Sequence, residues 1–291
     1  MDSKLLQGRE KTMESSEILL NVERTAGWLK KLATGFKPVT AIIAGSGLSN
    51  SLPRLDDKLS VSYKDIPGFP STTVKGHAGE MVFGRMGGAD VVVMRGRFHY
   101  YEGRPLNFIA FPVRVLAALG VKNLVLTAAV GSLKPAIKPG DMLILRDHIN
   151  FMGSNPLIGN YHQAFGAMFP DMNEPYDKAM RKEIMKLARS LKIRATEGVY
   201  TAVTGPSYES AAEVKMYRMF GGDIAGMSVV PETIAARQLL MRVAGICWIS
   251  NFASGISKTV LTHDEVLELG EKVSVKMRAL LEALLKSKAV K

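Results

Sequence analysis

The sequence predicts an α/β protein that folds as a single domain. Short apolar runs typical of strands alternate with segments of helical spacing along the chain, and this pattern indicates a mostly parallel or mixed sheet covered by helices on both faces. No repeat and no Pro/Gly/Ser-rich linker divides the 291 residues. With 47% hydrophobic and 22% charged residues, the chain can bury a large core.

The first half of the chain predicts five strands and one helix. Each strand is an apolar run bounded by turn residues or charges, whereas "PLNFIAFPVRVLAALG" has the length and spacing of a helix. The strands are expected at 39–45, 80–86, 90–96, 123–129 and 141–149, and the helix at 105–120. Residues 1–16 show no convincing pattern. We therefore expect a mobile N-terminal segment at 1–16 and one domain over 17–291.

The second half continues the alternation. Helices around 176–192, from about 208 and from about 231 separate strands expected at 198–205, 223–228 and 245–251. A long final helix follows, and Thr262 with Glu265 fits a capping box at its start. Ligands of such sheets bind where the strands end, so the residues that follow the strands are the candidates for chemistry.

Charge and composition exclude several classes of protein. The net charge is +11, but the lysines and arginines are spread along the chain without zinc-finger spacing or a long basic run, so nucleic acid is a weak hypothesis. No apolar stretch has the length of a membrane span or of a signal peptide. The single cysteine, Cys247, lies in an apolar run and is expected to be a buried, inert thiol. We expect a cytoplasmic protein that binds neither membrane nor nucleic acid.

The stretch "MRGRFHYYEG", residues 94–103, follows an apolar strand with polar residues at alternating positions. If the extended conformation continues past Met94, then Arg97, His99 and Tyr101 share one face and the intervening aromatic residues share the other. A strand end whose polar residues meet water is the alternative interpretation.

Two glycine-rich turns add hydrogen-bond donors in the first half. Ser46 lies in "AGSGL", where a Gly-Ser-Gly turn allows backbone N–H groups to approach an anion; a plain turn explains it equally well. His77 lies between two glycines before a strand and is either accessible or structural. Together with Arg97 and His99, these residues suit an oxyanion. The five histidines lack close ligand spacing, so no metal is predicted.

The second half contributes polar residues at strand and helix ends. In "TGPSYESAAEV", Ser207 fits a helix cap, and Glu209 fits a first helical turn that would keep it ionised as an acceptor. Ser228 can donate to an anion or cap a helix, and Asn251 can cap or present its amide to a ligand. His263, just inside the final helix, is expected to be neutral near pH 7 because the positive helix end disfavours imidazolium.

Taken together, the motifs resemble the trimeric purine nucleoside phosphorylases, most closely the bacterial members that act on inosine and guanosine. The resemblance runs from about Ala41 to the final helix and rests on an ordered set: "AGSGL", "GHAGE", "GRFHYYEG", "GDMLILRDHINFMGSNPLIG", "TGPSYES", "AGMSVVPE" and "ISN". It implies a partly barrel-like central mixed sheet of the phosphorylase/hydrolase-like fold and a homotrimer. It also implies cleavage of purine nucleosides by inorganic phosphate, a co-substrate, with no cofactor.

The resemblance assigns roles residue by residue. It implies that phosphate is bound by Ser46, His77, Arg97, His99, the backbone of Ala129 and Ser228. It implies that ribose is bound by Tyr101, Met227, His263 and, from a neighbouring subunit, Phe165. It implies that the base is bound by Tyr208, Glu209, Ala225 and Asn251, and that the catalytic groups are Asn251, Glu209 and His99. As an acceptor, Glu209 favours 6-oxopurines, which carry a proton on N1, over adenine, which does not.

Two positions depart from the family pattern. Ala128 in "TAAVGS" stands where asparagine is expected, which is nearer the related methylthioadenosine phosphorylases, and Phe252 follows Asn251. Glu209, Asn251 and His263 still favour the nucleoside phosphorylase, because the methylthio relatives replace the base-site pair and bind no 5'-hydroxyl. The alternative hypotheses are a methylthioadenosine phosphorylase and a nucleotide- or nucleic-acid-binding protein that uses the basic charge.

Overall fold

The protein was analysed as a computed structural model that describes residues 15–45, 52–70, 78–159, 161–257 and 263–290, with the side chains of 263–268 outside the description. Within these ranges nine strands form one mixed sheet. The strands are β1 (Thr40–Ile43), β2 (Asp56–Ser62), β3 (Glu80–Met86), β4 (Ala89–Arg95), β5 (Asn123–Ser132), β6 (Met142–Asn150), β7 (Ala195–Ala202), β8 (Ile224–Gly226) and β9 (Arg242–Phe252).

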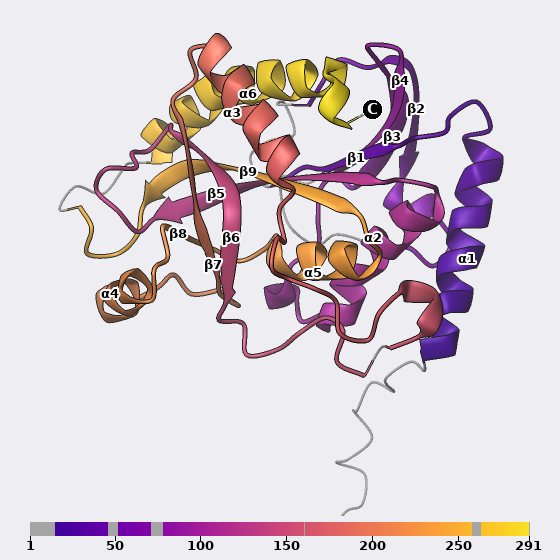
Figure 1. The fold of residues 1–291 in the computed structure, drawn as a ribbon, viewed down its shortest axis with the longest axis horizontal. Coiled ribbons are helices and arrows are strands. Elements are labelled where there is room, and N and C mark those ends of the chain that lie inside the picture. Colours follow the sequence, from indigo (N-terminus) through magenta and orange to yellow (C-terminus); the bar gives the residue numbers. More distant parts are fainter. Residues whose placement is uncertain (1–14, 46–51, 71–77, 160, 258–262, 291) are drawn as a thin grey trace, which may run out of the picture.

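The sheet combines an open part with a closed part. Its order is β2-β3-β4-β1-β5-β8-β7-β6-β9, and an additional pairing joins β5 to β9. The five strands from β5 to β9 therefore close into a barrel, and β1 to β4 extend from it as an open sheet (Figure 1). Strand β1 is parallel to both β4 and β5, and β5 is parallel to β9. The carboxyl ends of these four strands thus lie at one edge of the sheet.

Helices cover both faces of the sheet. They are α1 (Ser15–Leu32), α2 (Leu106–Ala118), α3 (Lys178–Ser190), α4 (Ala211–Met219), α5 (Val230–Gln238) and α6 (His263–Lys286). On β1, Ala41 and Ile43 join the core cluster that includes α1, α2 and α5, whereas Ile42 joins the cluster that includes α3 and α6. This alternation follows from the two-residue period of a strand, and it explains why β1 is apolar throughout.

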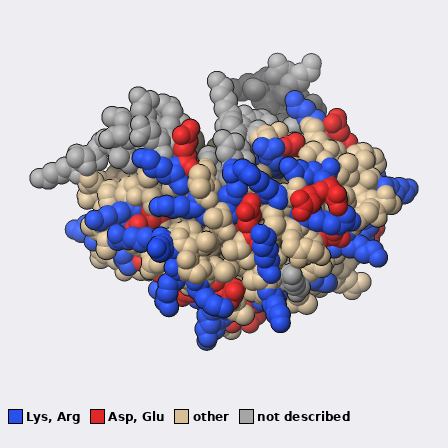
Figure 2. Space-filling view, turned by 90° about the horizontal axis from the view of Figure 1, so that it is seen from above, with Lys and Arg blue, Asp and Glu red and all other residues tan. Residues whose placement is uncertain are grey.

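The face that carries α3 and α6 is markedly basic. Figure 2 shows Lys and Arg side chains spread over this face with fewer Asp and Glu side chains between them. Among the described helices, none is long and apolar enough to cross a membrane. Cys247 is buried, as expected, and burial raises the pKa of its thiol to about 12.

The predicted α/β class, the mixed sheet and its partly barrel-like closure are confirmed. Every predicted strand and helix is present, with boundaries that shift by a few residues. Two elements, α1 and β2, were not predicted, and α1 begins at Ser15, inside the segment 1–16. Residues 1–14 and the proposed capping residue Thr262 lie outside the described residues.

Two local predictions were wrong. Strand β4 ends at Arg95, and the turn at Gly96 (φ 129°) is followed by a 3-10 helix at Tyr100–Glu102, so the extended alternation does not continue through Tyr101. Helix α4 starts after Ser210, whose hydroxyl accepts from the N–H of Glu213 in a capping box. Ser207 is therefore not the cap, and Glu209 precedes the helix.

Candidate active site

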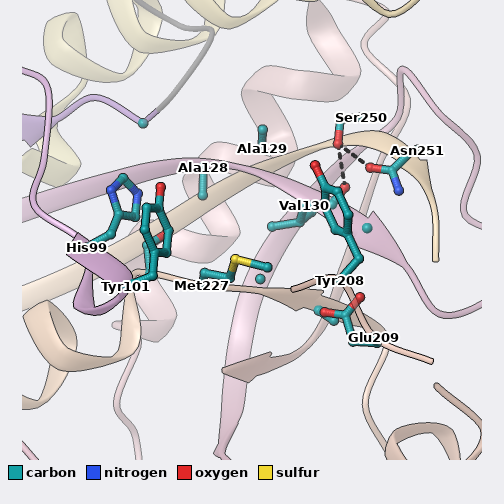
Figure 3. Close-up of a pocket in the computed structure, with 15 residues that line it drawn as sticks. His99, Tyr101, Ala128, Ala129, Val130, Tyr208, Glu209, Met227, Ser250 and Asn251 are labelled. Atoms are coloured by element: carbon teal, nitrogen blue, oxygen red, sulfur yellow. Dashed lines mark hydrogen bonds between the residues drawn. The ribbon is translucent and has the colours of Figure 1, made fainter. Parts of the chain in front are cut away.

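A cavity of about 190 Å³ opens where the carboxyl ends of β1, β5 and β9 meet the segment after β4 and the segments around β8. It is lined by Gly45, His99, Tyr101, Ala128, Ala129, Val130, Gly131, Tyr208, Glu209, Ala225, Gly226, Met227, Ser228, Ser250 and Asn251. Figure 3 shows His99 and Tyr101 at one end and Tyr208, Glu209, Ser250 and Asn251 at the other, with Met227 between them. The cavity thus has two polar ends.

The end of β1 and the middle of β5 are held together by Gly45, Thr127 and Arg97. A Cβ on Gly45 would lie 2.5 Å from the carbonyl oxygen of Thr127, so only glycine permits this approach. The Gly45 N–H donates to the Thr127 hydroxyl at 3.1 Å. From the other side, the Arg97 Nη2 donates to the carbonyl oxygens of Thr127 (2.7 Å) and Ile43 (3.1 Å). The cation therefore joins β1 to β5 beside the cavity.

Arg97 reaches the cavity through Ser228. Its side chain is 2% exposed and lies 3.7 Å from the Glu232 carboxylate, measured from Nε to Oε1, and its Nη1 donates to the Ser228 hydroxyl at 2.8 Å. Because that hydroxyl oxygen accepts from Arg97, its own proton is directed elsewhere and can be donated to an anion in the cavity. Ser228 thus presents a donor backed by a buried positive charge.

The backbone after Ser228 is strained. Val229 has φ 71° and ψ −50° and is fully buried, although a β-branched residue rarely adopts a positive φ. The Ser228 N–H donates to the Tyr200 hydroxyl at 3.1 Å. Helix α5 begins at the next residue, Val230, and its positive end favours a nearby anion. Such strain concentrates at functional sites, and here it fixes the position of Ser228.

His99 is held by the 3-10 helix that follows it. Its backbone N–H donates to Glu102 Oε1 at 2.7 Å, and its Nδ1 lies 3.4 Å from the same oxygen. The imidazole stacks on the Tyr101 ring, with centroids 4.7 Å apart. Because Nδ1 faces Glu102, the other ring nitrogen lies on the side away from the carboxylate. Burial raises the pKa of the Tyr101 phenol, which therefore stays protonated as a donor.

At the opposite end, the Asn251 amide has a fixed orientation. Its Oδ1 accepts from the Ser250 hydroxyl at 2.7 Å (Figure 3), and its Nδ2 donates to the Phe252 carbonyl at 2.9 Å. An amide nitrogen has two protons, so one remains for a ligand. The Glu209 carboxyl lines the same end, and burial raises its pKa. This end therefore offers a donor and an acceptor to one ligand.

The described residues contain no group of three His, Cys, Asp or Glu side chains placed to hold a metal ion. Hydrogen-bond donors at one end and a carboxylate with an amide at the other suit two co-substrates: an anion and a polar heterocycle. Sequence comparison agrees with this arrangement, because the family model described as "Phosphorylase superfamily" matches residues 40–286. The chain belongs to the phosphorylase superfamily.

Within this superfamily the similar proteins are purine nucleoside phosphorylases. Purine nucleoside phosphorylase 1 of Geobacillus stearothermophilus is 48% identical over 92% of this chain and 97% of its own length. The crystal structure of Schistosoma mansoni purine nucleoside phosphorylase in complex with adenosine has a TM-score of 0.87 at 36% identity, covering 93% of this chain and 98% of that one. A Schistosoma purine nucleoside phosphorylase in complex with guanosine has a TM-score of 0.86 at 34% identity, covering 95% and 99%.

Most of the residues assigned by phosphorylase resemblance lie together in the cavity. They are His99, Tyr101, Ala129, Tyr208, Glu209, Ala225, Met227, Ser228 and Asn251. Ser46 and His77 lie outside the described residues. For His263 the structure gives only its position as the first residue of α6.

Three assigned residues differ from expectation. Arg97 does not line the cavity and meets it through Ser228. Phe165 is buried in its own chain, 3% exposed, with the Arg114 guanidinium 4.5 Å from its ring centre. Glu209 was expected to be kept ionised by a helix end, but it lies outside α4 and burial raises its pKa.

Sequence reasoning missed several residues that line the cavity. Val130, Gly131, Gly226 and Ser250 belong to it without having been assigned. Ser250 carries the clearest signal, because a hydroxyl directly before a strand-end asparagine can orient the amide. The glycines serve close packing: a Cβ on Gly226 would lie 2.3 Å from the Tyr200 hydroxyl oxygen.

Proposed function

We propose that this chain catalyses the reversible phosphorolysis of purine ribonucleosides and deoxyribonucleosides, preferentially inosine and guanosine. The products are the free base and ribose or deoxyribose 1-phosphate, as in purine salvage. The observation that carries the proposal is that one cavity is lined both by Ser228 and His99, which suit an anion, and by Glu209 and Asn251, which suit a purine base. No cofactor is required, because phosphate itself is the nucleophile.

At the phosphate end, the chain supplies donors and a buried charge. Ser228 donates its hydroxyl proton, His99 turns the nitrogen away from Glu102 toward the anion, and Arg97 contributes its charge from behind Ser228. Ser46, His77 and the Ala129 backbone complete this end in the proposal. Phosphate held there faces the sugar, where it opposes the positive character that develops as the glycosidic bond breaks. Tyr101, Met227 and His263 position the ribose.

At the base end, the leaving purine gains negative charge as the same bond breaks. Asn251 donates its remaining amide proton toward N7 and O6, a contact that strengthens as charge develops there. Glu209 accepts from N1–H, and from the exocyclic amine of guanine. Tyr208 and Ala225 border the base. Asn251, Glu209 and His99 are therefore the proposed catalytic groups.

A methylthioadenosine phosphorylase is the second candidate, and one observation favours it. Ala128 lines the cavity, so the departure from the family pattern lies within reach of a ligand. Glu209 supports the first candidate, because adenine has no proton on N1 to donate. Among the similar structures, one phosphorylase holds adenosine and another holds guanosine, so the shared fold does not select the base and individual side chains must do so.

We infer from two exposed apolar surfaces that the chains associate. That three chains form the oligomer is implied by the resemblance to the trimeric phosphorylases. Ile158, Met168 and Phe169 are 68%, 54% and 85% exposed around a groove of about 790 Å³. A second surface contains Met219 and Phe220, 79% and 62% exposed. Two different surfaces on one chain fit a head-to-tail interface that closes into a ring. Phe165 would have to leave Arg114 to reach a neighbour's ribose pocket.

From the proposed reaction we also infer a cytoplasmic location.

The substrate proposal is tested by assaying inosine, guanosine, adenosine and methylthioadenosine in parallel, with and without inorganic phosphate. Phosphate-dependent release of hypoxanthine and guanine, with the highest kcat/KM for these two nucleosides, is expected. Preference for methylthioadenosine would favour the second candidate. Salt-sensitive polynucleotide binding without phosphate-dependent base release would contradict both. Sedimentation of the protein as three chains tests the trimer.

A further inference from the structure

A second cavity, of about 320 Å³, lies against the open part of the sheet and shares no lining residue with the active-site cavity. Val82 on β3 and Val93 on β4 are register partners and form its apolar floor. The chain at 52–55 and helix α6 contribute the walls. This second cavity is called the basic cavity below.

Four cationic side chains line the basic cavity, one from each of four segments. They are Arg54 before β2, Lys58 on β2, Arg95 at the end of β4 and Arg278 on α6. No Asp or Glu is among its lining residues. Two carboxylates lie nearby: Glu80 pairs with the Arg95 Nη1, and Glu282 accepts from the backbone N–H of Arg54 at 3.0 Å. The four cationic side chains of the cavity therefore outnumber the two nearby carboxylates.

Arg95 itself has donor capacity left. Its Nε is buried and has no hydrogen-bond partner among the described residues, although a buried donor without an acceptor is costly. An anion with several oxygens would supply acceptors to Arg95 and to the other three cations. The basic cavity thus has the charge and the unused donor of an anion site.

The close approach of the 52–55 segment to the sheet depends on Gly84. A Cβ on Gly84 would lie 2.7 Å from the Leu55 Cβ and 3.0 Å from the Asp56 carbonyl oxygen, so any side chain at position 84 would push the wall away. Leu55 is 6% exposed. The wall that carries Arg54 is therefore packed against the sheet rather than lying loosely over it.

We propose that the basic cavity is a second anion site that binds a small molecule carrying one or more phosphate groups. The cations take the phosphate oxygens, and the floor of Val82 and Val93 contacts the rest of the ligand. The cavity volume of about 320 Å³ suits a small ligand. The basic face that carries α6 (Figure 2) attracts anions toward this side of the molecule.

The test compares binding of three probes to the full chain by isothermal titration calorimetry: inorganic phosphate, pyrophosphate and guanosine 5'-monophosphate. The variant is Arg54→Ala/Lys58→Ala, which removes two exposed cations of the basic cavity. The matched control is Lys182→Ala/Arg189→Ala, which removes the same charges from exposed positions on α3. Neither pair lines the active-site cavity, so phosphorolysis is expected to continue in both.

The wild type and the control are expected to bind one more equivalent of pyrophosphate per chain than the variant does. If the variant still binds that equivalent, its affinity for pyrophosphate is expected to be at least 10-fold weaker. Tighter binding of the nucleotide than of inorganic phosphate identifies a nucleotide as the source of the phosphate group; equal binding identifies free phosphate. Identical stoichiometry and affinity in all three proteins would overturn the proposal. A single-stranded oligonucleotide that displaces pyrophosphate at lower concentration than the nucleotide would overturn it in favour of nucleic acid.

Discussion

Arg97 and Arg114 are equally buried, at 1% exposure each, yet their surroundings differ. Arg97 has three hydrogen-bond acceptors and a carboxylate 3.7 Å away. Arg114, on α2, has no hydrogen-bond partner for any guanidinium nitrogen in the described parts of the chain, and its guanidinium lies over the Phe165 ring. Burial lowers the pKa of Arg114 to about 10, so it remains charged near pH 7.

The difference separates two uses of a buried cation. At Arg97 the surrounding acceptors offset the cost of burial, and the cation fixes β1, β5 and the Ser228 hydroxyl relative to one another. At Arg114 an aromatic face offsets a smaller part of that cost. The first arrangement positions groups of the active site, whereas the second leaves a buried cation without a hydrogen-bond acceptor among the described residues.

The largest expected effect is that of Arg97→Met. The substitution leaves the Glu232 carboxyl buried at 2% exposure without its cation, which typically costs about 3 to 5 kcal/mol. Urea unfolding at fixed protein concentration measures the loss. Arg97→Met/Glu232→Leu is expected to recover much of the stability but not the activity, since Ser228 still lacks its donor. Loss of less than about 1 kcal/mol in the single variant would remove the contrast between the two arginines.

His148 extends the comparison to a group that loses its charge on burial. Its Nδ1 lies 3.1 Å from the Tyr176 hydroxyl, and burial lowers its pKa to about 4, against a small opposing effect of Asp147. The unfolded chain therefore binds this proton more readily, and stability is lost as the pH falls from about 6.5 toward 4, by about 2 to 3 kcal/mol.

The measurement is unfolding by urea across this pH range for the wild type and His148→Gln. Because carboxyl groups also titrate in both proteins over this pH range, the informative quantity is the difference between the two profiles of unfolding free energy against pH. The variant is expected to lose less stability on acidification. Parallel profiles would show that His148 takes up its proton equally in the folded and unfolded states.

Glu209 extends the comparison to a buried carboxyl group. Burial is the main cause of its raised pKa, and no cation is among the causes. Glu209→Ala removes an ionised acceptor, worth about 1.5 to 3 kcal/mol, so kcat/KM for guanosine is expected to fall roughly 10- to 150-fold. Because the pKa is raised, wild-type activity on guanosine should also decline at mildly acidic pH as the carboxyl is protonated, and this part of the decline should vanish in the variant. Adenosine is the control substrate; unchanged guanosine kinetics would mean that Glu209 does not contact the base.

The smallest effect is expected for Arg114→Met. No hydrogen bond of the described residues is lost, the charge no longer has to be buried, and methionine keeps contact with the Phe165 ring. Unfolding free energy is expected to change by less than about 1 kcal/mol. A loss above about 3 kcal/mol would show that Arg114 has an acceptor in the assembled protein. Both arginines would then be stabilised by hydrogen-bond acceptors, and the contrast between them would disappear.

Periodicity predicted most of the fold because strands such as β3 and β4 are bounded apolar runs, and each face of the sheet is covered. The missed helix α1 buries Ile18, Val22 and Leu29, a helical spacing, but its many charges obscured the pattern. Strand β2 has mostly exposed residues, so the apolar signal that marks the other strands is absent.

The site was predicted by motif more than by geometry. His99 and Ser228 were placed correctly beside the strand ends, but no local pattern indicates that Arg97 turns inward to the carbonyl oxygens of residues 43 and 127. These contacts bring together segments far apart in sequence. The basic cavity was not predicted for the same reason, because its cations come from segments that are separate in the sequence.

Strand β5 has a consequence for the order in which the protein becomes active. It pairs with β1 and then β8 along one edge and with β9 along the other, and β5 and β9 lie roughly 120 residues apart in the chain. Contacts of such long separation form late because loop closure must precede them. Ala129 comes from one of these strands and Asn251 from the other. During refolding, catalytic activity should therefore return only with the slowest recovery of sheet structure.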